Sequence, residues 1–386
     1  MGKDLLISSY NNFKILAHQP KGTESEYGIT LNDKKYILDQ NVNPAFILQH
    51  PKLNFIYMCY ESIKDGRIGT FSLNKNKDTK EIELKEVNSV SSGGKSSCYL
   101  IFDSNLENII NINYWDSTIS LHTLREGILE EPRYIYVSKQ KHIAQNMEQH
   151  LANRQSEPHF HSAVFWNNML LVPDLGIDQI HFFSYQPNLI NQPIKLIGDY
   201  QIDKNNGPRY LRIKEDFLYV INEIRSSISV FYLKLDKDTM NSKNSLPTIN
   251  LIQNISTLPL NYLDYNTSSN IMIHPNQNFI FASNRGHNSI SVFKINNINN
   301  DNKGNDNKGT DNKGNNKLKL VKIYSCHGKT PRHFNFSLDG TKLYVANQDS
   351  DDISIFNINT KDGTLEFKSC FTCNSPNFIL PIKFYN

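Results

Sequence analysis

The stretch FLYVINEIRSSISVFYL, residues 217–233, decides the fold of this chain. An apolar run stops at Glu223, turns through Arg225, Ser226 and Ser227, and then resumes as a second apolar run. Two runs of β-favouring residues on either side of a short polar turn predict a β-hairpin. The carboxylate at the end of a strand otherwise built for burial needs a partner, because a buried charge is costly when it is unpaired.

The same phrase recurs along the chain, and six copies align. They are FIYMCYESIKDGRIGTFSL from Phe55, IININYWDSTISLHTL from Ile109, LLVPDLGIDQIHFFSY from Leu170, the opening copy, FIFASNRGHNSISVFKI from Phe279 and KLYVANQDSDDISIFNI from Lys342. Their spacing of about 47 to 63 residues lies within or just beyond the range of repeats that build propeller blades. Another short apolar stretch precedes each copy, so each unit contains more strand than one hairpin.

A seventh unit is predicted to be split between the two ends of the chain. SPNFILPIKF, Ser375 to Phe384, resembles the first strand of a blade, and DLLISSY and FKILAHQ supply candidate partners. Closing the ring in this way removes exposed strand edges. We therefore predict one all-β domain over residues 1–386, a seven-bladed β-propeller whose last blade is closed by N- and C-terminal strands.

Two segments depart from the β pattern. Residues 139–155 are compatible with a helix or a polar loop, whereas residues 296–317 repeat Asn, Lys, Gly and Asp. The second segment cannot bury apolar surface, so we expect a disordered loop between strands of the fifth blade.

Composition and net charge argue against two kinds of partner, membranes and nucleic acids. No apolar run approaches the roughly 20 residues that span a bilayer, and a net charge of +3 without a basic stripe argues against nucleic acid. The N-terminus lacks a signal-peptide design, and five cysteines do not form a disulfide framework, so we expect a cytoplasmic protein. The lone CFTC sequence, residues 370–373, is interpreted as a core or edge position rather than a metal site.

The repeat also predicts which side chains meet. In an antiparallel hairpin the start of the first strand lies beside the end of the second, which makes Arg209 a neighbour of Glu223. The other blades are expected to place similar pairs at one mouth of the channel: His161 beside residues 173–175, Arg332 beside Asn347 and Gln348, Cys98 beside Asn113 and Tyr114, Ala45 beside Tyr60 and Glu61, and Ser269 and Asn270 beside Asn284 and Arg285. We interpret Asn222, Asn284 and Asn347 as residues that close turns. A concave mouth lined by several converging polar side chains is the usual form of a binding site, so we predict the binding site there.

These residues carry a resemblance to a known family. The segments VSSGGKSSCYLIFD, EPHFHSAVFWNNMLLVPDLGIDQI, GPRYLRIKEDFLYVINEIRSSISVF, HPNQNFIFASNRGHNSISVF and GKTPRHFNFSLDGTKLYVANQDSDDISIF resemble successive blades of the lactonase family of seven-bladed propellers. That family includes propeller-type 6-phosphogluconolactonases and carboxy-cis,cis-muconate lactonizing enzymes. The likeness runs from about residue 43 to the C-terminus.

The resemblance implies a set of site residues. The catalytic set corresponds to His161, Arg209, Glu223 and Arg285, with His159 as a second candidate for the histidine. Further substrate-binding positions are His159, Arg332, His333 and Gln348, and Lys329 would extend an anion pocket unless it is a solvated turn residue. The chain departs from the family where a histidine or an acidic residue is common, with Tyr99, Tyr210 and Asn270 in those places.

The expected activity is hydrolysis of a sugar lactone, foremost 6-phosphoglucono-δ-lactone, with a small anionic lactone as the only partner. Lactone opening needs an activated water, an oxyanion donor and a proton for the leaving alkoxide. Glu223 or His161 is expected to act as the base and the arginines as anion donors. No cofactor, metal or covalent intermediate is expected. A carboxy-muconate cycloisomerase and a non-catalytic interaction platform are the alternatives, and the oligomeric state stays open.

Overall fold

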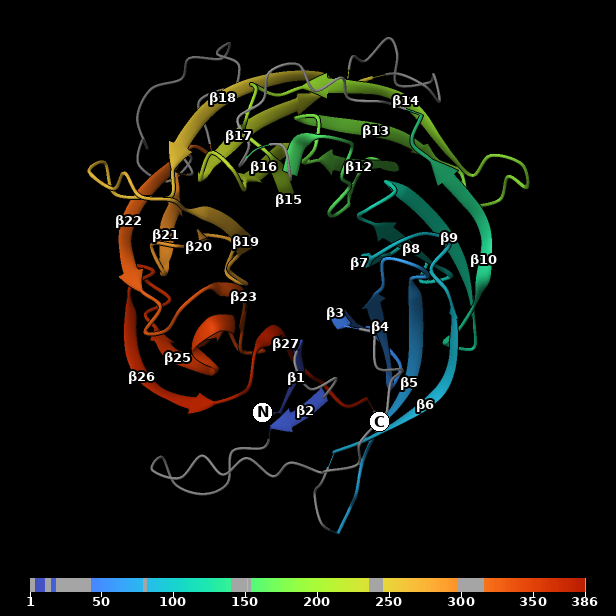
Figure 1. Ribbon diagram of the computed structural model, residues 1–386, viewed down its shortest axis with the longest axis horizontal. Helices are drawn as coiled ribbons and strands as arrows, with labels where there is room; N and C mark the ends of the chain where they lie inside the picture. The colour runs from blue at the N-terminus through green and yellow to red at the C-terminus, as the bar shows by residue number, and fades with distance from the viewer. Residues whose placement is uncertain are drawn as a thin grey trace, which may run out of the picture.

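Seven antiparallel β-sheets stand like blades around a central axis in the computed structural model of this chain (Figure 1). The structure describes residues 4–10, 15–18, 43–78, 82–139, 151, 154–235, 246–296 and 316–385. Six blades have four strands and the seventh has three. The predicted seven-bladed propeller is therefore confirmed.

Within each four-stranded blade the strands follow chain order from the axis outward (Figure 1). Blades 1 to 3 consist of β3 (Asn43–Gln49), β4 (Phe55–Glu61), β5 (Arg67–Lys75) and β6 (Ile82–Ser91); β7 (Ser97–Phe102), β8 (Asn108–Asn113), β9 (Thr118–Arg125) and β10 (Ile128–Val137); and β11 (Val164–Trp166), β12 (Met169–Asp174), β13 (Gln179–Tyr185) and β14 (Ile194–Gln201).

Blades 4 to 6 repeat this arrangement. They consist of β15 (Pro208–Lys214), β16 (Phe217–Asn222), β17 (Ser227–Lys234) and β18 (Thr248–Ser256); β19 (Thr267–Ile273), β20 (Phe279–Arg285), β21 (Ser289–Ile295) and β22 (Leu318–Ser325); and β23 (Pro331–Phe336), β24 (Lys342–Asn347), β25 (Asp352–Ile358) and β26 (Leu365–Thr372), with a 3₁₀ turn, η2 (Gln348–Ser350), after β24.

The seventh blade joins the two ends of the chain. The C-terminal strand β27 (Pro376–Pro381) is innermost and pairs with β1 (Leu5–Ser9), which in turn pairs with β2 (Ile15–His18). The N-terminal strands thereby complete a sheet that the C-terminal strand begins, as the sequence predicted. This closure matters for the site, because the same blade contributes residues to the central pocket.

Burial falls from the second strand of a blade to the fourth. Strands β8, β12 and β16 are buried at every position, whereas the outermost β10 alternates between half-buried and exposed residues along most of its length. Second strands lie between neighbouring blades on both faces, so their side chains are buried whether they are apolar or, like Asn111 and Asn113 of β8, polar and hydrogen-bonded. Outermost strands have one solvated face.

An asparagine closes the same turn in successive blades. The amide of Asn222, just before Glu223, donates to the hydroxyls of Ser227 and Ser229. Asn284 and Asn347 make the corresponding bonds in blades 5 and 6, to Ser289 and Ser291 and to Asp352 and Ser354. The interpretation of these asparagines as structural residues is confirmed.

The structure describes only some residues of the two segments outside the repeat. Of residues 139–155, the structure describes Lys139, Leu151, Arg154 and Gln155, and the last three are helical. Of residues 296–317 it describes the two ends, and the predicted disorder lies outside the described residues. Within the described ranges, no helix is long and apolar enough to cross a bilayer, and all five cysteines are free.

Candidate active site

A bulge in the innermost strand aims one side chain of nearly every blade at the axis. In four blades the pairing of the first and second strands skips one residue, which is Ala45, Cys98, Arg209 or Arg332. In blade 5 it skips two residues, Ser269 and Asn270. In the blade that joins the termini, the pairing of β27 with β1 skips Asn377. In blade 3 the isolated bridge between Phe160 and Asp174 precedes His161. A bulge re-aims side chains at strand ends, commonly beside functional sites.

Six of these positions line one central pocket, whereas Ser269 and Asn270 do not; the six are Ala45, Cys98, His161, Arg209, Arg332 and Asn377. The pocket holds about 300 Å³ of space that no protein atom fills, including solvent at its mouth. The lining residues are Ala45, Glu61, Cys98, His161, Arg209, Tyr210, Arg332, His333, Asn377 and Phe378. The predicted convergence of strand starts and strand ends from separate blades is thus confirmed for His161, Arg209, Arg332 and Glu61.

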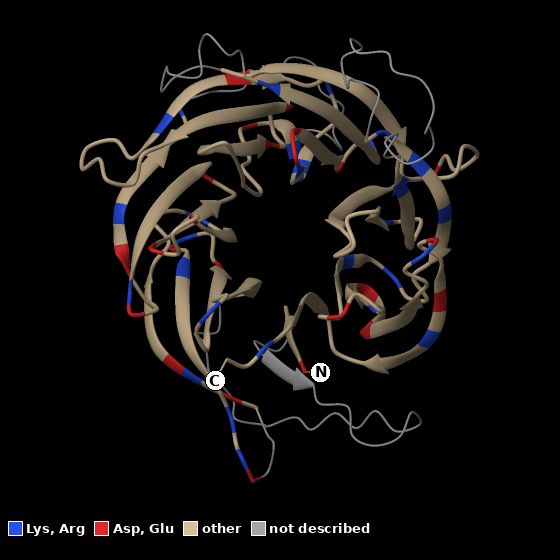
Figure 2. Ribbon diagram, turned by 180° about the vertical axis from the view of Figure 1, so that it is seen from behind, with Lys and Arg blue, Asp and Glu red and all other residues tan. Residues whose placement is uncertain are grey.

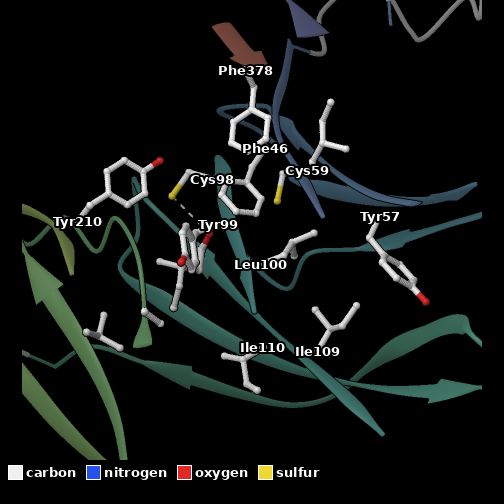
Figure 3. Close-up of a cluster of buried hydrophobic side chains, with 14 of the residues drawn as sticks. Phe46, Tyr57, Cys59, Cys98, Tyr99, Leu100, Ile109, Ile110, Tyr210 and Phe378 are labelled. Carbon is white, nitrogen blue, oxygen red and sulfur yellow. Dashed lines mark hydrogen bonds between the residues drawn. The ribbon is translucent and has the colours of Figure 1, made fainter. Parts of the chain in front are cut away.

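Aromatic residues one position beyond the bulges pack together at the centre of the ring. Phe46 contacts Tyr99 and Phe378 at ring-centroid distances of 4.6 and 4.7 Å, and Tyr99 lies 5.8 Å from Tyr210 (Figure 3). His333 stacks on Phe378 at 3.9 Å. Tyr99 and Tyr210, which stand at the positions of the histidines expected from the resemblance, therefore belong to one aromatic cluster, and Tyr210 also lines the pocket.

Glu223 is the centre of a buried charge cluster. Its carboxylate accepts a hydrogen bond from Nη1 of Arg209, and Nη2 of Arg285 lies 3.1 Å from the same oxygen. Nη2 of Arg154 lies 3.4 Å from the other oxygen. The Glu223 side chain is fully buried. The carboxylate that ends the strand thus has three guanidinium partners.

The three arginines decide the ionisation of this cluster. Burial alone would raise the pKa of Glu223, but Arg285, Arg209 and Arg154 together hold that pKa far below the ordinary carboxyl value. Burial lowers the pKa of Arg285 to about 10 despite the opposing effect of Glu223, so Arg285 stays protonated near neutral pH. A carboxylate held in this way is a poor proton acceptor, and it does not line the pocket.

Arg154 is the member of this cluster that sequence reasoning missed. It lies in the helical residues before blade 3, outside the repeated phrase, and interaction with Glu223 raises its pKa. No repeat alignment points to such a residue. A basic side chain in a segment compatible with a helix was the only signal in the sequence.

Blades 1, 6 and 7 contribute a second charge cluster. Glu61 is the last residue of β4 in blade 1, and Tyr10 occupies the equivalent position just after β1 in blade 7. The Tyr10 hydroxyl accepts a hydrogen bond from Nη2 of Arg332, whose guanidinium lies 4.8 Å from the centre of the Tyr10 ring, and both groups stabilise the Glu61 carboxylate electrostatically. Aligning the split seventh blade with the others would have identified Tyr10 and Asn377.

The histidines of the site are uncharged near neutral pH. Burial, followed by the charge of Arg209, lowers the pKa of His161 well below its usual value. Burial and neighbouring arginines lower the pKa of His333 to about 3. Nδ1 of His161 and Nε of Arg209 have no hydrogen-bond partner among the described residues, although both are buried. Two polar atoms with free hydrogen-bonding capacity therefore belong to residues that line the pocket.

Other predicted positions lie outside the lining. His159 stacks on Tyr114 at 4.4 Å, and Gln348 begins the 3₁₀ turn after β24. Asn270 donates to the carbonyl of Phe334, and Lys329 is exposed at the surface. Of the eight predicted residues, His161, Arg209, Arg332 and His333 line the pocket, Glu223 and Arg285 lie behind it, and His159 and Gln348 do neither.

The remaining signals do not assemble into another site. No group of three or more metal-ligating side chains occurs among the residues that the structure describes. In the CFTC sequence Cys370 is exposed on β26 and Cys373 is buried just after it. Acidic and basic residues are interspersed around the outer strands (Figure 2), so no stripe of one sign competes with the central pocket.

Comparison with known proteins points to one family. A family model described as "Lactonase, 7-bladed beta-propeller" matches residues 24–381. The chain is 23% identical over 355 residues to the 6-phosphogluconolactonase of Bacillus subtilis (strain 168), covering 89% of this chain and 90% of that protein. It is 28% identical over 346 residues to the 6-phosphogluconolactonase of Buchnera aphidicola subsp. Acyrthosiphon pisum (strain APS), covering 86% and 85%.

A solved structure supports the same fold. The periplasmic gluconolactonase of Pseudomonas aeruginosa superimposes with a TM-score of 0.75 at 18% identity, covering 98% of each chain. At this identity the likeness shows a shared fold and no more.

Proposed function

This chain belongs to the lactonase family of seven-bladed β-propellers, and we propose that it hydrolyses a sugar lactone with an anionic group, 6-phosphoglucono-δ-lactone in particular. Two relatives that align over most of their length are named 6-phosphogluconolactonase. One observation carries the proposal, which is the excess of positive charge in the two clusters of arginine and glutamate at the pocket.

The two charge clusters are unbalanced. Arg154, Arg209 and Arg285 face Glu223, and Arg332 faces Glu61, while His161 and His333 are neutral. These clusters therefore carry an excess of two positive charges. Buried charges need compensation, and a phosphoryl group supplies between 1.5 and 2 negative charges near neutral pH. A neutral aldonolactone would leave the excess uncompensated.

The geometry gives each group a role in lactone opening. Arg209 lines the pocket, so its guanidinium can donate hydrogen bonds to the oxyanion that develops on the lactone carbonyl. Glu223 and Arg285 lie behind Arg209 and fix the direction of its guanidinium. His161 offers a neutral imidazole to a substrate oxygen. Arg332, which blade 6 contributes to the lining, is suited to the phosphoryl group, since guanidinium binds phosphate in a fork.

A two-substrate assay tests the proposal. The purified protein is given 6-phosphoglucono-δ-lactone and glucono-δ-lactone at matched concentrations, and the spontaneous hydrolysis of each is subtracted. We expect kcat/KM at least about 100-fold higher for the phosphorylated lactone, which corresponds to two charge-assisted contacts of about 1.5 kcal/mol each. Lys329→Met, an exposed cation outside the lining, is the control and should leave both rates unchanged.

Other outcomes have defined meanings. Equal rates for the two lactones would overturn the role of the charge excess. Turnover of a carboxylated muconate alone would establish the cycloisomerase, and no turnover of any of these would support a non-catalytic platform. Under the proposal, the reaction belongs to carbohydrate metabolism, in the pentose phosphate pathway. A cytoplasmic location is part of the same proposal, and the five free cysteines support it.

A further inference from the structure

Glu61 is the carboxylate that reaches the pocket. It ends β4 in blade 1 and lines the pocket together with His161 and Arg209. Its place in the repeat is the same as that of Glu223, because Tyr60 pairs with Pro44 as Asn222 pairs with Pro208, and each glutamate is the next residue. The two glutamates are therefore equivalent in sequence position and opposite in exposure, because Glu61 is half-buried and Glu223 is fully buried.

The partners of the two carboxylates differ as well. Glu223 has three guanidinium partners and no contact with the pocket. Glu61 faces the guanidinium of Arg332 and the hydroxyl of Tyr10, with Arg209 farther away. The thiols of Cys59 and Cys98, from β4 and β7, are the other titratable groups that sense its charge. Glu61 is thus the less compensated of the two carboxylates.

This difference appears in the proton affinity. Burial raises the pKa of Glu61 above the ordinary carboxyl value, while Arg332, the Tyr10 hydroxyl and Arg209 oppose the rise without cancelling it. A base with a raised pKa accepts a proton more readily from water. His161 lacks this property, since burial beside Arg209 disfavours its protonated form.

Resting on the proposed function, we propose that Glu61 is the general base of lactone hydrolysis and that Tyr10 is the positioning residue that holds it. Nothing in the family comparison assigns this part of the pocket. The inference rests on the placement of Glu61 in the same lining as Arg209 and Arg332, on the hydrogen bond that joins Arg332 to Tyr10 and on the withdrawal of Glu223 from the pocket.

The step balances with water as the sole co-reactant. The Glu61 carboxylate takes one proton from a water molecule while the water oxygen bonds to the lactone carbonyl carbon. The carbonyl electron pair moves onto its oxygen, where Arg209 donates. Collapse of this intermediate breaks the bond between the carbonyl carbon and the ring oxygen, and the ring oxygen receives the proton from Glu61. The product acid loses its own proton to solvent.

The first test compares Glu61→Gln with Glu83→Gln, an exposed glutamate on the outermost strand of the same blade. Each variant is assayed for kcat/KM with 6-phosphoglucono-δ-lactone between pH 4.5 and 7. General-base catalysis contributes about 10²- to 10⁴-fold, so Glu61→Gln should lose at least about 100-fold. It should also lose the acidic limb of the pH profile, which is the fall in kcat/KM as the base becomes protonated at low pH. Glu83→Gln should match the wild type.

Folding and binding are measured on the same samples. Because burial disfavours the charged form of Glu61, the neutral glutamine should not lower the unfolding temperature at pH 7. Calorimetric binding of 6-phosphogluconate, the product, should persist in Glu61→Gln. Lost binding together with lost activity would assign Glu61 a structural role and overturn the proposal.

Tyr10→Phe is the second test, and it keeps the base in place. Removal of the hydroxyl that favours the carboxylate should raise the pKa of Glu61, so the fall in activity at low pH should move to higher pH while activity at its plateau stays within about tenfold. The substrate's own phosphoryl ionisation is common to both proteins and cancels in the comparison. An unmoved limb would contradict the proposal even if Glu61→Gln failed to fold.

The two proposals fail in different ways. A wild-type protein that hydrolyses none of the lactones would remove the proposed function itself. A wild-type protein that hydrolyses the phosphorylated lactone, with Glu61→Gln retaining its rate and its acidic limb, would leave the function standing and overturn the role of Glu61. Loss of the limb in His161→Gln but not in Glu61→Gln would assign the base to His161.

Discussion

Nη2 of Arg154 lies 3.4 Å from the Glu223 carboxylate, and this pair joins a helical segment before blade 3 to the end of a strand in blade 4. Glu223 also contacts Arg209 and Arg285, so a single carboxylate partly neutralises three cations. This arrangement holds the guanidinium groups of Arg154 and Arg285 outside the pocket lining, and it leaves the electrostatic potential at the pocket positive. The variants below separate its role in binding from its role in stability.

Arg154→Met is expected to weaken substrate binding more than it weakens folding. The side chain is 39% exposed, and Glu223 retains two partners without it, but the pocket loses one positive charge. We expect KM for 6-phosphoglucono-δ-lactone to rise roughly 3- to 10-fold with kcat little changed. Steady-state kinetics at low and high salt would measure this. Arg125→Met, at an exposed surface ion pair, is the control, and an equal rise in KM for both variants would contradict the expectation.

Glu223→Gln is expected to destabilise the protein at neutral pH. Breaking a buried ion pair by removing one partner costs about 3–5 kcal/mol, and here three cations lose their counter-charge. Urea unfolding at pH 7 would measure the loss, with Glu83→Gln as control. Unchanged stability would show that the arginines are compensated by solvent.

The pH dependence of that loss has a definite sign. The arginines depress the pKa of Glu223 in the folded state, so its stabilising contribution is fully present above the unfolded carboxyl pKa of about 4.3. The contribution disappears as pH falls through the depressed folded pKa. The stability difference between wild type and Glu223→Gln should therefore shrink when unfolding is measured at successively lower pH below 4. A constant difference would rule out this titration.

Asn377→Ala is expected to weaken the closure of the ring. Asn377 accepts from the Ser8 hydroxyl within blade 7 and donates to the carbonyl of Pro44 in blade 1. Its removal leaves two buried groups unsatisfied, at about 1–3 kcal/mol. Chemical unfolding would show the loss, and Asn188→Ala, at an exposed turn, should show none. Equal stability of the two variants would mean that strand pairing alone closes the ring.

Residues 297–315 should be replaceable by a two-residue Asn-Gly turn without effect on folding or activity. The backbone N–H of Asn296 donates to the carbonyl of Lys317, and the N–H of Asn316 donates to the carbonyl of Asn296. The ends of the segment are already as close as the ends of a hairpin turn, which Asn-Gly suits. Thermal unfolding and kcat/KM within twofold of wild type would confirm this. A fall in either would assign the segment a role.

Much of this architecture follows from the sequence. The repeated phrase predicts the blades and their hairpins, because each depends on apolar periodicity and turn residues within a few dozen residues. The pairing of the two chain ends was predictable from the incomplete repeats that they carry, since a closed ring needs one more blade. The contact between Arg209 and Glu223 was predictable for the same reason, since both lie in one hairpin with a fixed register.

What only the tertiary structure decided is how charge is shared between blades. Arg154 reaches Glu223 from a connecting segment, and Glu61, Tyr10 and Arg332 meet from blades 1, 7 and 6 once the ring has closed. Glu61 and Glu223 occupy equivalent positions of the repeat but differ in burial and in partners, so their pKa values are shifted in opposite directions. A local pattern fixes where a side chain stands on its own strand, whereas the dielectric and the neighbouring charges come from chain segments far away in the sequence.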